Sequence, residues 1–275
     1  MDVNQFKPRN QELQKYIDSF YILTHPENEK EVSYLTFPTP FSVVAAVLNA
    51  KSSVSSERIT TTYSSSVSLD TSLVCRFNKP ICFKYQGKIK EVCIYFKPLG
   101  LNAFLQKPLE SYSSSFFDKF IPFSDYEIAM QKILELDDID SISIKIEEYW
   151  IKKRIGFEHP FLFDSIHKIQ ENPKIKTSEL ASSYNISQKT LITHFKRHLC
   201  KTPTEFKKIL RFRKALTKMQ SANKKTRLTE LSYMIDFFDQ SHMVGDFKSL
   251  TGISPKAFFK KLKCIENSNI HWIFT

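Results

Sequence analysis

The pattern of apolar and polar positions changes twice along this chain of 275 residues. Near the start, three apolar residues recur at helical spacing and predict a short helix within residues 11–23: Leu13, Ile17 and Phe20. From Val32 to Phe96 the chain is rich in β-branched and aromatic residues interrupted by Pro, Asn and Gly, which is typical of strands and turns. Helical spacing returns after Pro122, so the pattern predicts a β-rich first part and a helical second part.

Two continuous apolar runs in the β-rich part, Val43–Leu48 and Val92–Phe96, predict buried strands. Between them, residues 52–72 contain 13 Ser or Thr among 21 positions. Such a stretch forms either a polar hairpin at a sheet edge or a mobile loop, and the sequence leaves both possibilities open.

A pair of helices is predicted after the β-rich part. Ser124-x-x-Glu127 has the form of a capping box, which would start the first of them. The second follows the acidic interruption at 137–140, and its apolar face carries Ile142, Ile146 and Trp150. We expect this pair to join two domains, with the boundary near Gly156–Pro160.

Residues 161–263 contain an internal repeat, which is the most specific feature of the chain. At an offset of 52, Leu191 aligns with Met243, Phe195 with Phe247, Lys196 with Lys248, Cys200 with Gly252, Thr202 with Ser254, Pro203 with Pro255 and Phe206 with Phe258. Upstream the offset is 51, and Leu180 aligns with Leu231, Ala181 with Ser232 and Ile186 with Phe237. Each unit therefore predicts a short helix, a tight turn, a second helix and a capped third helix.

The first unit has the expected capping residues and apolar faces. Thr177 is predicted to cap a helix whose inward-facing residues are Leu180, Ala181 and Tyr184. Asn185-Ile186-Ser187 forms the turn, with Ser187 as the N-cap of the next helix. The residues that this next helix buries are Leu191, Phe195 and Leu199.

The second unit repeats this arrangement. Leu231 and Ile235 face inward, Asp236 lies in the turn, and Asp239 caps a helix that carries Met243, Phe247 and Leu250. In both units the third helix begins with a proline after a capping residue, in Thr202-Pro203-x-Glu205 and in Ser254-Pro255. Proline is well tolerated there because its missing N–H needs no partner at the first helical position.

Units of this kind are helix-turn-helix motifs, in which the second helix, here called the reading helix, enters a DNA major groove. A joining helix of about 19 residues, from Thr202 to Gln220, would separate the two units by ~28 Å. This is near one turn of B-DNA, so both reading helices could enter successive major grooves on one face. A helical scaffold for protein interactions is the alternative interpretation.

The charge is concentrated in the same region as the repeat. Residues 160–275 contain 21 Lys and Arg against 9 Asp and Glu, a net charge of +12, whereas residues 1–159 contain 19 against 20. The whole excess of +11 therefore lies in the C-terminal part. A basic domain after a neutral one indicates a polyanionic partner or a solvated basic surface.

The repeat resembles the DNA-binding domain of the AraC/XylS family of bacterial transcription regulators, over about 100 of the 275 residues. In the first unit the resemblance rests on Ser187-x-x-x-Leu191-x-x-x-Phe195-Lys196-Arg197, Thr202-Pro203-x-x-Phe206 and Arg211-x-x-x-Ala215. In the second unit it rests on Phe237-Phe238-Asp239-Gln240-Ser241-His242-Met243, Phe247-Lys248 and Gly252-Ile253-Ser254-Pro255.

Three positions depart from the family pattern. Cys200 and Asp236 stand where the family usually has Gly, which predicts slightly altered turns. Gly245 replaces a residue that is commonly Arg in the second reading helix. An interior Gly weakens a helix by roughly 1 kcal/mol relative to Ala. We therefore expect the second unit to discriminate less between DNA sequences.

The N-terminal part is similar, more weakly, to a β-rich domain that often precedes this DNA-binding domain. The similarity lies in Leu13–Tyr21 and in Phe96–Gly100. We expect an α+β chain with a β-rich sensing or association domain, a helical linker, an all-α DNA-binding domain with two helix-turn-helix units joined by a long helix, and a tail. The expected limits are 1–122, 123–156, 157–265 and 266–275.

Residues near the start of a reading helix meet base edges, and Lys, Thr and Gln side chains carry suitable donors and acceptors. The predicted base contacts are Lys189, Thr193, Gln240, Ser241 and His242. The predicted phosphate contacts are Lys196, Arg197, Arg211 and Lys248. Arg211 matches an Arg of the family and has a structural ion pair as its alternative role.

The expected partner is double-stranded DNA. The resemblance leaves open RNA polymerase as a further partner, and a small-molecule effector or a homodimer through the N-terminal domain. The polar N-terminus and the shortness of the apolar run Phe41–Leu48, against the ~20 residues of a membrane span, indicate a cytoplasmic protein.

No enzymatic activity, cofactor or metal ligand is expected, because the chain lacks Gly-rich phosphate loops, His-Glu-x-x-His and Gly-x-Ser-x-Gly. Its five cysteines are irregularly spaced and are interpreted as reduced thiols. The alternatives are a DNA-binding repair or metal-sensing regulator with a reactive cysteine, and a non-DNA helical interaction scaffold.

Overall fold

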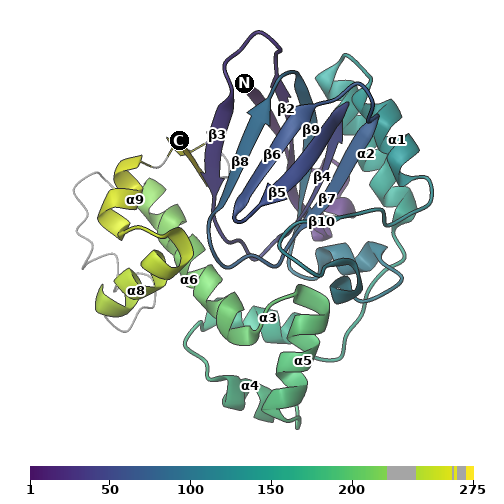
Figure 1. The fold of residues 1–275 in the computed structure, drawn as a ribbon. Helices are drawn as coiled ribbons and strands as arrows, with labels where there is room; N and C mark the ends of the chain where they lie inside the picture. The colour runs from purple at the N-terminus through teal and green to yellow at the C-terminus, as the bar shows by residue number, and fades with distance from the viewer. Residues whose placement is uncertain (222–239, 262, 265–270) are drawn as a thin grey trace.

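The computed structural model describes residues 1–221, 240–261, 263–264 and 271–275. Two β-sheets packed on each other form the N-terminal part, and helices form the C-terminal part (Figure 1). The predicted α+β class with a β-rich part followed by helices is therefore confirmed. Within these residues, no helix combines the length and the apolar character that crossing a bilayer requires.

The first sheet has the spatial order β1-β2-β9-β4-β7-β10. Its strands are β1 (Asp2–Phe6), β2 (Ile17–His25), β9 (Ile89–Phe96), β4 (Ser42–Leu48), β7 (Leu69–Val74) and β10 (Asp118–Lys119). Both predicted buried strands lie at its centre, paired antiparallel as β4 and β9.

Both faces of this sheet are buried, which explains the continuous apolar runs. Successive side chains of a strand point to opposite faces. Val44 and Ala46 accordingly belong to a core with the helices α1 (Tyr126–Leu134) and α2 (Ile139–Lys153), whereas Val43 and Val47 belong to the core between the sheets.

The second sheet has the order β11-β12-β3-β8-β6-β5. Its strands are β11 (Lys263–Cys264), β12 (His271–Phe274), β3 (Val32–Thr36), β8 (Ile81–Gln86), β6 (Arg58–Tyr63) and β5 (Ala50–Ser55). The Ser- and Thr-rich segment is thus a polar edge hairpin, β5–β6, rather than a mobile loop. Its strand β6 pairs parallel with β8.

The prediction of a first helix within 11–23 is wrong. A 3-10 turn, η1 (Leu13–Lys15), is followed by β2, which pairs with both β1 and β9. Ile17 and Phe20 are buried as expected. The three residues that follow Phe20 in the strand, Tyr21, Ile22 and Leu23, are buried as well. A strand that is buried on both faces carries a continuous apolar run instead of alternating apolar and polar residues. The helical spacing of the apolar residues therefore did not distinguish a helix from a strand here.

The two segments behind the N-terminal resemblance meet in space. The backbone N–H of Lys97 donates to the carbonyl oxygen of Tyr16 at 2.8 Å. At Gly100 a Cβ atom would lie 2.2 Å from that same oxygen, so only glycine allows this approach. Gly100 opens a second 3-10 turn, η2 (Gly100–Phe104).

The predicted helices after Pro122 are α1 and α2, and the capping box proposed for the first is absent. α1 begins at Tyr126, and Asp125 before it makes no side-chain cap because its carboxylate accepts from Lys153 and Tyr149. The expected apolar face of α2 is confirmed, since Ile142, Ile146 and Trp150 are fully buried. These helices share a core with the first sheet, so packing does not mark 123–156 as a separate linker.

The C-terminal helices form two groups below and beside the sheets (Figure 1). They are α3 (Leu162–Glu171), α4 (Thr177–Ser182), α5 (Gln188–Leu199), α6 (Pro203–Ser221), α8 (Gln240–Thr251) and α9 (Pro255–Lys261). The first group packs around Leu180, Leu191 and Phe195. The second packs around Phe212, Phe247 and Phe258 and includes Phe37 from the β-rich part.

The end of the chain returns to the β-rich part. Strand β12 pairs antiparallel with β3 through Ile273 opposite Leu35 and Phe274 opposite Tyr34. Trp272 is 1 % exposed and stacks on Tyr34, with ring centroids 4.2 Å apart. Within the segment expected as a tail, residues 271–274 therefore form a strand of the second sheet.

Candidate nucleic-acid interface

The first helix-turn-helix unit has the predicted geometry. Ser187 caps α5, its hydroxyl accepting from the backbone N–H of Thr190 at 3.0 Å. Asn185 has a φ of 54°, a left-handed conformation that Asn tolerates in tight turns. The predicted inward face is confirmed, because Leu191, Phe195 and Leu199 are buried.

The predicted cap at Thr177 is wrong. Thr177 is the first helical residue of α4, and Lys176 precedes it as the capping position. The Glu179 carboxylate accepts from the backbone N–H of Lys176 at 3.2 Å, while the Thr177 hydroxyl accepts from the ammonium of Lys207 at 3.3 Å. The Thr177 hydroxyl therefore ties α4 to α6.

The first reading helix, α5, exposes the predicted DNA-contacting side chains. Lys189 and Thr193 are exposed on its N-terminal half, and Lys196 and Arg197 are exposed further along. Arg197 also approaches the carboxylate of Glu110 at 4.0 Å. All four predicted contacts of this helix therefore lie at the surface.

The second reading helix corresponds to α8. Gln240, Ser241 and His242 occupy its first positions, and their side chains lie outside the described residues. The first helix of this unit and its turn, with Leu231, Ile235, Asp236 and the cap Asp239, lie outside them as well. Lys248 is exposed, and the predicted inward-facing Phe247 and Leu250 are buried.

Helix α6 joins the units, as predicted, and its start is confirmed in detail. The Glu205 carboxylate accepts from the backbone N–H of Thr202 at 2.7 Å, and the Thr202 hydroxyl accepts from that of Glu205 at 3.2 Å. This is a capping box followed by proline at the first helical position. Ser254 precedes Pro255 in the same way at α9, its hydroxyl accepting from Ala257 at 3.4 Å.

Arg211 forms the ion pair that was its alternative role. Its guanidinium lies 2.9 Å from the carboxylate of Asp246, and the side chains are 14 % and 12 % exposed. Lys208 lies 3.8 Å from the same carboxylate. These contacts fix α8 on α6. A phosphate contact by Arg211 stays a prediction. In such a contact the Arg211 guanidinium would bind the phosphate and Asp246 at the same time.

The two reading helices end in the same backbone conformation, although the residue that follows the helix is Cys200 in the first unit and Gly252 in the second. Cys200 after α5 has a φ of 55°, and Gly252 after α8 has a φ of 75°. Both adopt the left-handed cap that terminates many helices, although only Gly does so without steric cost. Gly245 is exposed within α8, and a Cβ there would meet nothing within 4 Å.

The C-terminal end of α5 packs against the β-rich part, which the sequence did not reveal. The backbone oxygen of His198 accepts from the Asn102 amide at 2.9 Å. The ammonium of Lys201 is buried and donates to the carbonyl oxygen of Cys75 at 2.5 Å. Part of the basic excess is therefore structural, since Lys207 is likewise buried and donates to the carbonyl oxygen of Ile175.

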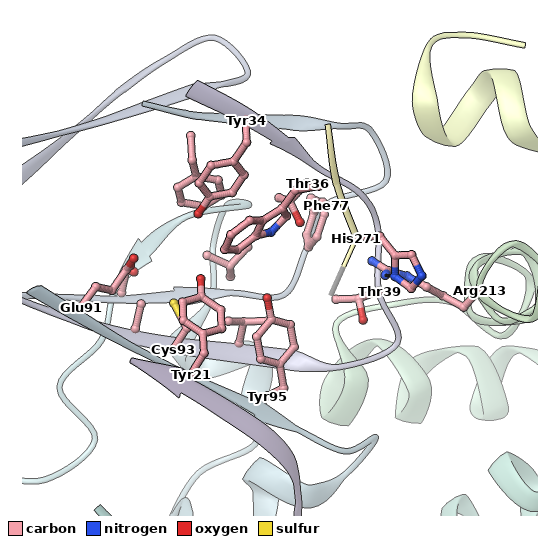
Figure 2. Close-up of a pocket in the computed structure, with 16 residues that line it drawn as sticks. Tyr21, Tyr34, Thr36, Thr39, Phe77, Glu91, Cys93, Tyr95, Arg213 and His271 are labelled. Carbon is pink, nitrogen blue, oxygen red and sulfur yellow. Dashed lines mark hydrogen bonds between the residues drawn. The ribbon is translucent and has the colours of Figure 1, made fainter. Parts of the chain in front are cut away.

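A cavity of about 40 Å³ lies between the two sheets (Figure 2). Its walls are mainly aromatic and include Tyr21, Tyr34, Phe77, Tyr95 and Trp272. Glu91 and Cys93 lie toward one end, and Arg213 of α6 with His271 of β12 lies at the other (Figure 2). The cavity is thus built jointly by the β-rich part, α6 and the end of the chain.

Two ionisable groups in its walls, the buried Glu91 and the partly buried Arg213, give the cavity its chemistry. Burial raises the pKa of Glu91 to about 7, and its carboxylate accepts from the Tyr85 hydroxyl. Burial lowers the pKa of Arg213 to about 10, and its guanidinium donates to the carbonyl oxygens of Pro38 and Phe37. The predicted contacts include none of these residues, because they converge from distant segments.

Four cysteines in the described part are free thiols: Cys75, Cys82, Cys93 and Cys200. Cys75 and Cys200 are neighbours across the contact between the β-rich part and α5. A hydrogen bond from Cys200 lowers the pKa of the Cys75 thiol below its ordinary value, assisted by the charge of Lys201.

The helix-turn-helix domain family matches residues 180–261 of this chain. Among solved structures, an apo form of ToxT from Vibrio cholerae shares 10 % identity, covering 88 % of this chain and 97 % of that chain with a TM-score of 0.46. ToxT with a bound unsaturated fatty acid shares 12 % identity, covering 92 % and 96 % with a TM-score of 0.42. No curated protein sequence matches the chain.

The family match begins within α4 and spans α5, α6, α8 and α9, and the predicted caps are present at the starts of α5, α6 and α9. Residues 180–261 are therefore similar to a helix-turn-helix domain, in agreement with the AraC-type units expected from the sequence.

Proposed function

We propose that this protein regulates transcription in the cytoplasm by binding double-stranded DNA sequence-specifically, with its two reading helices in successive major grooves. The observation that carries the proposal is the pairing of two like units on one helix, α6, with the first reading helix exposed along its N-terminal half. Successive major grooves on one face of B-DNA are about 34 Å apart, which a joining helix of this length approaches.

The proposed roles within α5 follow from position and side-chain type. Lys189 and Thr193 lie on the exposed N-terminal half, where a reading helix meets base edges. Lys196 lies two turns beyond Lys189 and is suited to a phosphate. In α8 we assign base contacts to Gln240, Ser241 and His242, and phosphate contacts to Lys248 and, shared with Asp246, to Arg211.

The experiment is DNA binding by the full chain, followed by selection of preferred sites from a random pool. We expect the affinity to fall steeply with salt, because neutralised phosphates release counterions. A selected site should bind at least a thousandfold more tightly than random DNA. Failure to bind any DNA at low salt would instead support the helical scaffold.

We further propose that the cavity between the sheets takes a small, mostly apolar effector. A cavity of about 40 Å³ holds only a few water molecules, since one needs roughly 10–15 Å³. A larger molecule must therefore displace Trp272, which fills the space beside Tyr34. Displacement would release β12 from β3 and disturb Arg213 on α6, the helix that joins the two DNA-binding units.

Tryptophan fluorescence tests this arrangement, because the chain has only two tryptophans, Trp150 and Trp272. Small apolar metabolites that bind the full chain should shift its emission to longer wavelength. The shift should vanish in Trp272→Phe and persist in Phe274→Ala, a control on the same strand with a 40 % exposed side chain. A binding metabolite that leaves Trp272 emission unchanged would contradict the displacement.

The domain limits and the remaining partners stay proposals. We keep 157–265 as the DNA-binding domain and regard 1–156 with the last strand as one packed unit, because α1, α2 and β12 all join its sheets. Sedimentation of the full chain with and without effector distinguishes a homodimer from a monomer. RNA polymerase is the further partner expected of an activator bound beside a promoter.

A further inference from the structure

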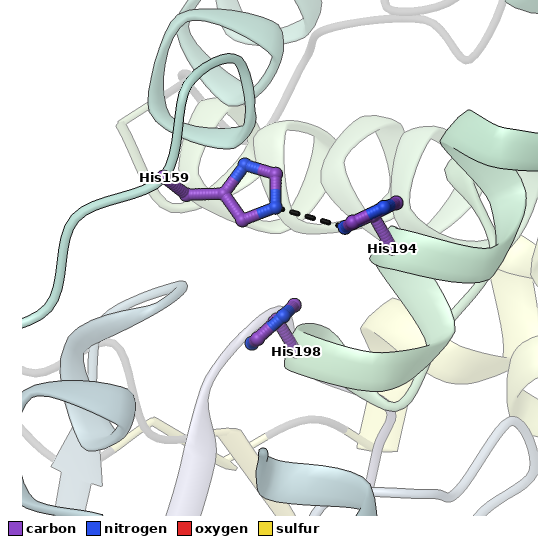
Figure 3. Close-up of side chains that lie close together, drawn as sticks. All are labelled: His159, His194 and His198. Atoms are coloured by element: carbon purple, nitrogen blue, oxygen red, sulfur yellow. Dashed lines mark hydrogen bonds between the residues drawn. The ribbon is translucent and has the colours of Figure 1, made fainter. Parts of the chain in front are cut away.

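Three histidine side chains converge beside the first reading helix (Figure 3). His194 and His198 lie four residues apart on α5, hence on one face of that helix. His159 comes from the segment between α2 and α3. One ligand nitrogen from each ring lies within 4.8 Å of the other two.

Two of the three imidazoles have a pKa below the ordinary value for histidine, because they are partly buried. Burial lowers the pKa of His159 to about 4, with a further contribution from His194. Burial also lowers the pKa of His198 to about 4, with a further contribution from His159. Neutral imidazole is the form that binds a metal ion.

The orientation of His198 is fixed by a residue of the β-rich part. Its Nδ1 lies 3.2 Å from the amide oxygen of Asn102, and the Asn102 amide donates to the His198 backbone oxygen at 2.9 Å. The Nδ1–H therefore donates to Asn102, which leaves the lone pair on Nε2. Such outer partners fix the tautomer of histidine ligands in metal sites.

The other two histidines, His159 and His194, form a hydrogen bond with each other. His159 Nε2 lies 2.9 Å from His194 Nδ1 (Figure 3). His159 Nδ1 accepts from the backbone N–H groups of Phe161 and Leu162 at 3.4 and 3.3 Å, so Nε2 carries the proton of this bond. Binding of an ion at Nε2 would move that proton to Nδ1 and end the two long backbone contacts.

We propose that His159, His194 and His198 bind one divalent transition-metal ion of the Zn²⁺ class, with a fourth position open to water. Three imidazoles suit Zn²⁺, Ni²⁺ and Cu²⁺, whereas Mg²⁺ and Ca²⁺ require oxygen ligands. Tetrahedral Zn–N bonds of about 2.0–2.1 Å place ligand nitrogens roughly 3.3 Å apart. The His159–His194 pair at 2.9 Å would thus open by a few tenths of an ångström.

The site has an entry path and a structural consequence. His159 and His194 are half-buried, so an ion can reach them from solvent, while His198 lies deeper. A bound ion would tie the segment before α3 to the reading helix and, through Asn102, to the β-rich part. The sequence concealed this set because His159 lies far from the pair on α5 in the chain.

The experiment uses the full chain, without an affinity tag and dialysed against a chelator, and Co²⁺ as the probe. We expect one Co²⁺ per chain, with the visible absorption of a four-coordinate ion, and displacement by Zn²⁺. Zn²⁺ should also raise the Tm by several degrees, since an ion bound only to the folded state stabilises it.

His194→Gln and His159→Gln should each abolish the Co²⁺ spectrum and the Zn²⁺-dependent rise in Tm. His167→Gln is the matched control, because His167 lies exposed on α3 outside the cluster. Circular dichroism of the metal-free variants checks that they fold. Less than one tightly bound ion per wild-type chain, or an unchanged spectrum in both cluster variants, would overturn the proposal.

Discussion

At the scale of single residues, the first reading helix separates two kinds of exposed side chain. Lys189 and Thr193 lie on the N-terminal half of α5, and Lys196 lies nearer its C-terminal end, where the helix packs against the β-rich part. Base contacts give specificity, while phosphate contacts position the protein and add affinity. These side chains are exposed, so their removal should leave the fold intact.

The comparison of Lys189→Ala with Lys196→Ala tests the assignment. Lys189→Ala should cost about 1–3 kcal/mol on the selected site and relax the preference at one base pair. Lys196→Ala should weaken binding to all sequences alike and reduce the salt slope by about one. Affinities on the site and its single-base variants measure both, and equal weakening of every variant by Lys189→Ala would refute its base-reading role.

A second prediction concerns Glu91 and stability. Burial raises its pKa to about 7, against about 4.3 in the unfolded chain. Between these values the folded state binds more protons, so stability falls as the pH rises from about 4.3 to about 7. The loss is on the order of 4 kcal/mol.

Glu91→Gln should therefore be more stable than wild type at pH 8 and about equally stable at pH 5. The Tyr85 hydroxyl can still donate to the amide oxygen, so the buried contact is kept. Urea unfolding at both pH values measures the effect, with exposed Glu57→Gln as control. If Glu91→Gln were less stable than wild type at pH 8, the prediction that the buried carboxylate lowers stability at that pH would be wrong.

At the scale of elements, the helix-turn-helix units were the most predictable. The caps at Ser187 and Thr202 and the buried faces of α5 follow from local rules that tertiary contacts do not override. The prediction of a first helix was wrong because β2 is buried on both faces. Its sequence therefore lacks the alternation of apolar and polar residues that marks a strand. The capping box at Ser124 failed because α1 begins at Tyr126, so the capping position is Asp125, whose carboxylate accepts from Lys153 and Tyr149.

The Gly245 position in α8 yields a prediction about element stability. A Cβ there meets nothing within 4 Å, so Gly245→Ala should stabilise the protein by about 1 kcal/mol. Gly252→Ala is the contrasting control and should destabilise it, because Gly252 has a φ of 75°. Thermal unfolding distinguishes them, and destabilisation by Gly245→Ala would mean that α8 is not a regular helix at this point.

At the scale of the whole molecule, the β-rich part contacts both DNA-binding units. Phe37 enters the core of the second unit, Leu99 enters that of the first, and β12 brings the end of the chain back to β3. None of these contacts leaves a local signature, since each joins segments far apart in sequence. The cavity, the histidine cluster and the role of Trp272 were hidden for this reason.

The central claim is that two reading helices on one joining helix bind two successive major grooves. Footprinting of the full chain on a selected site, with methylation interference at guanine N7, tests it most directly. We expect two protected major-groove segments about one helical turn apart on one face, the segment under α8 being less sensitive to base changes. Protection confined to one segment, or two segments on opposite faces, would contradict it.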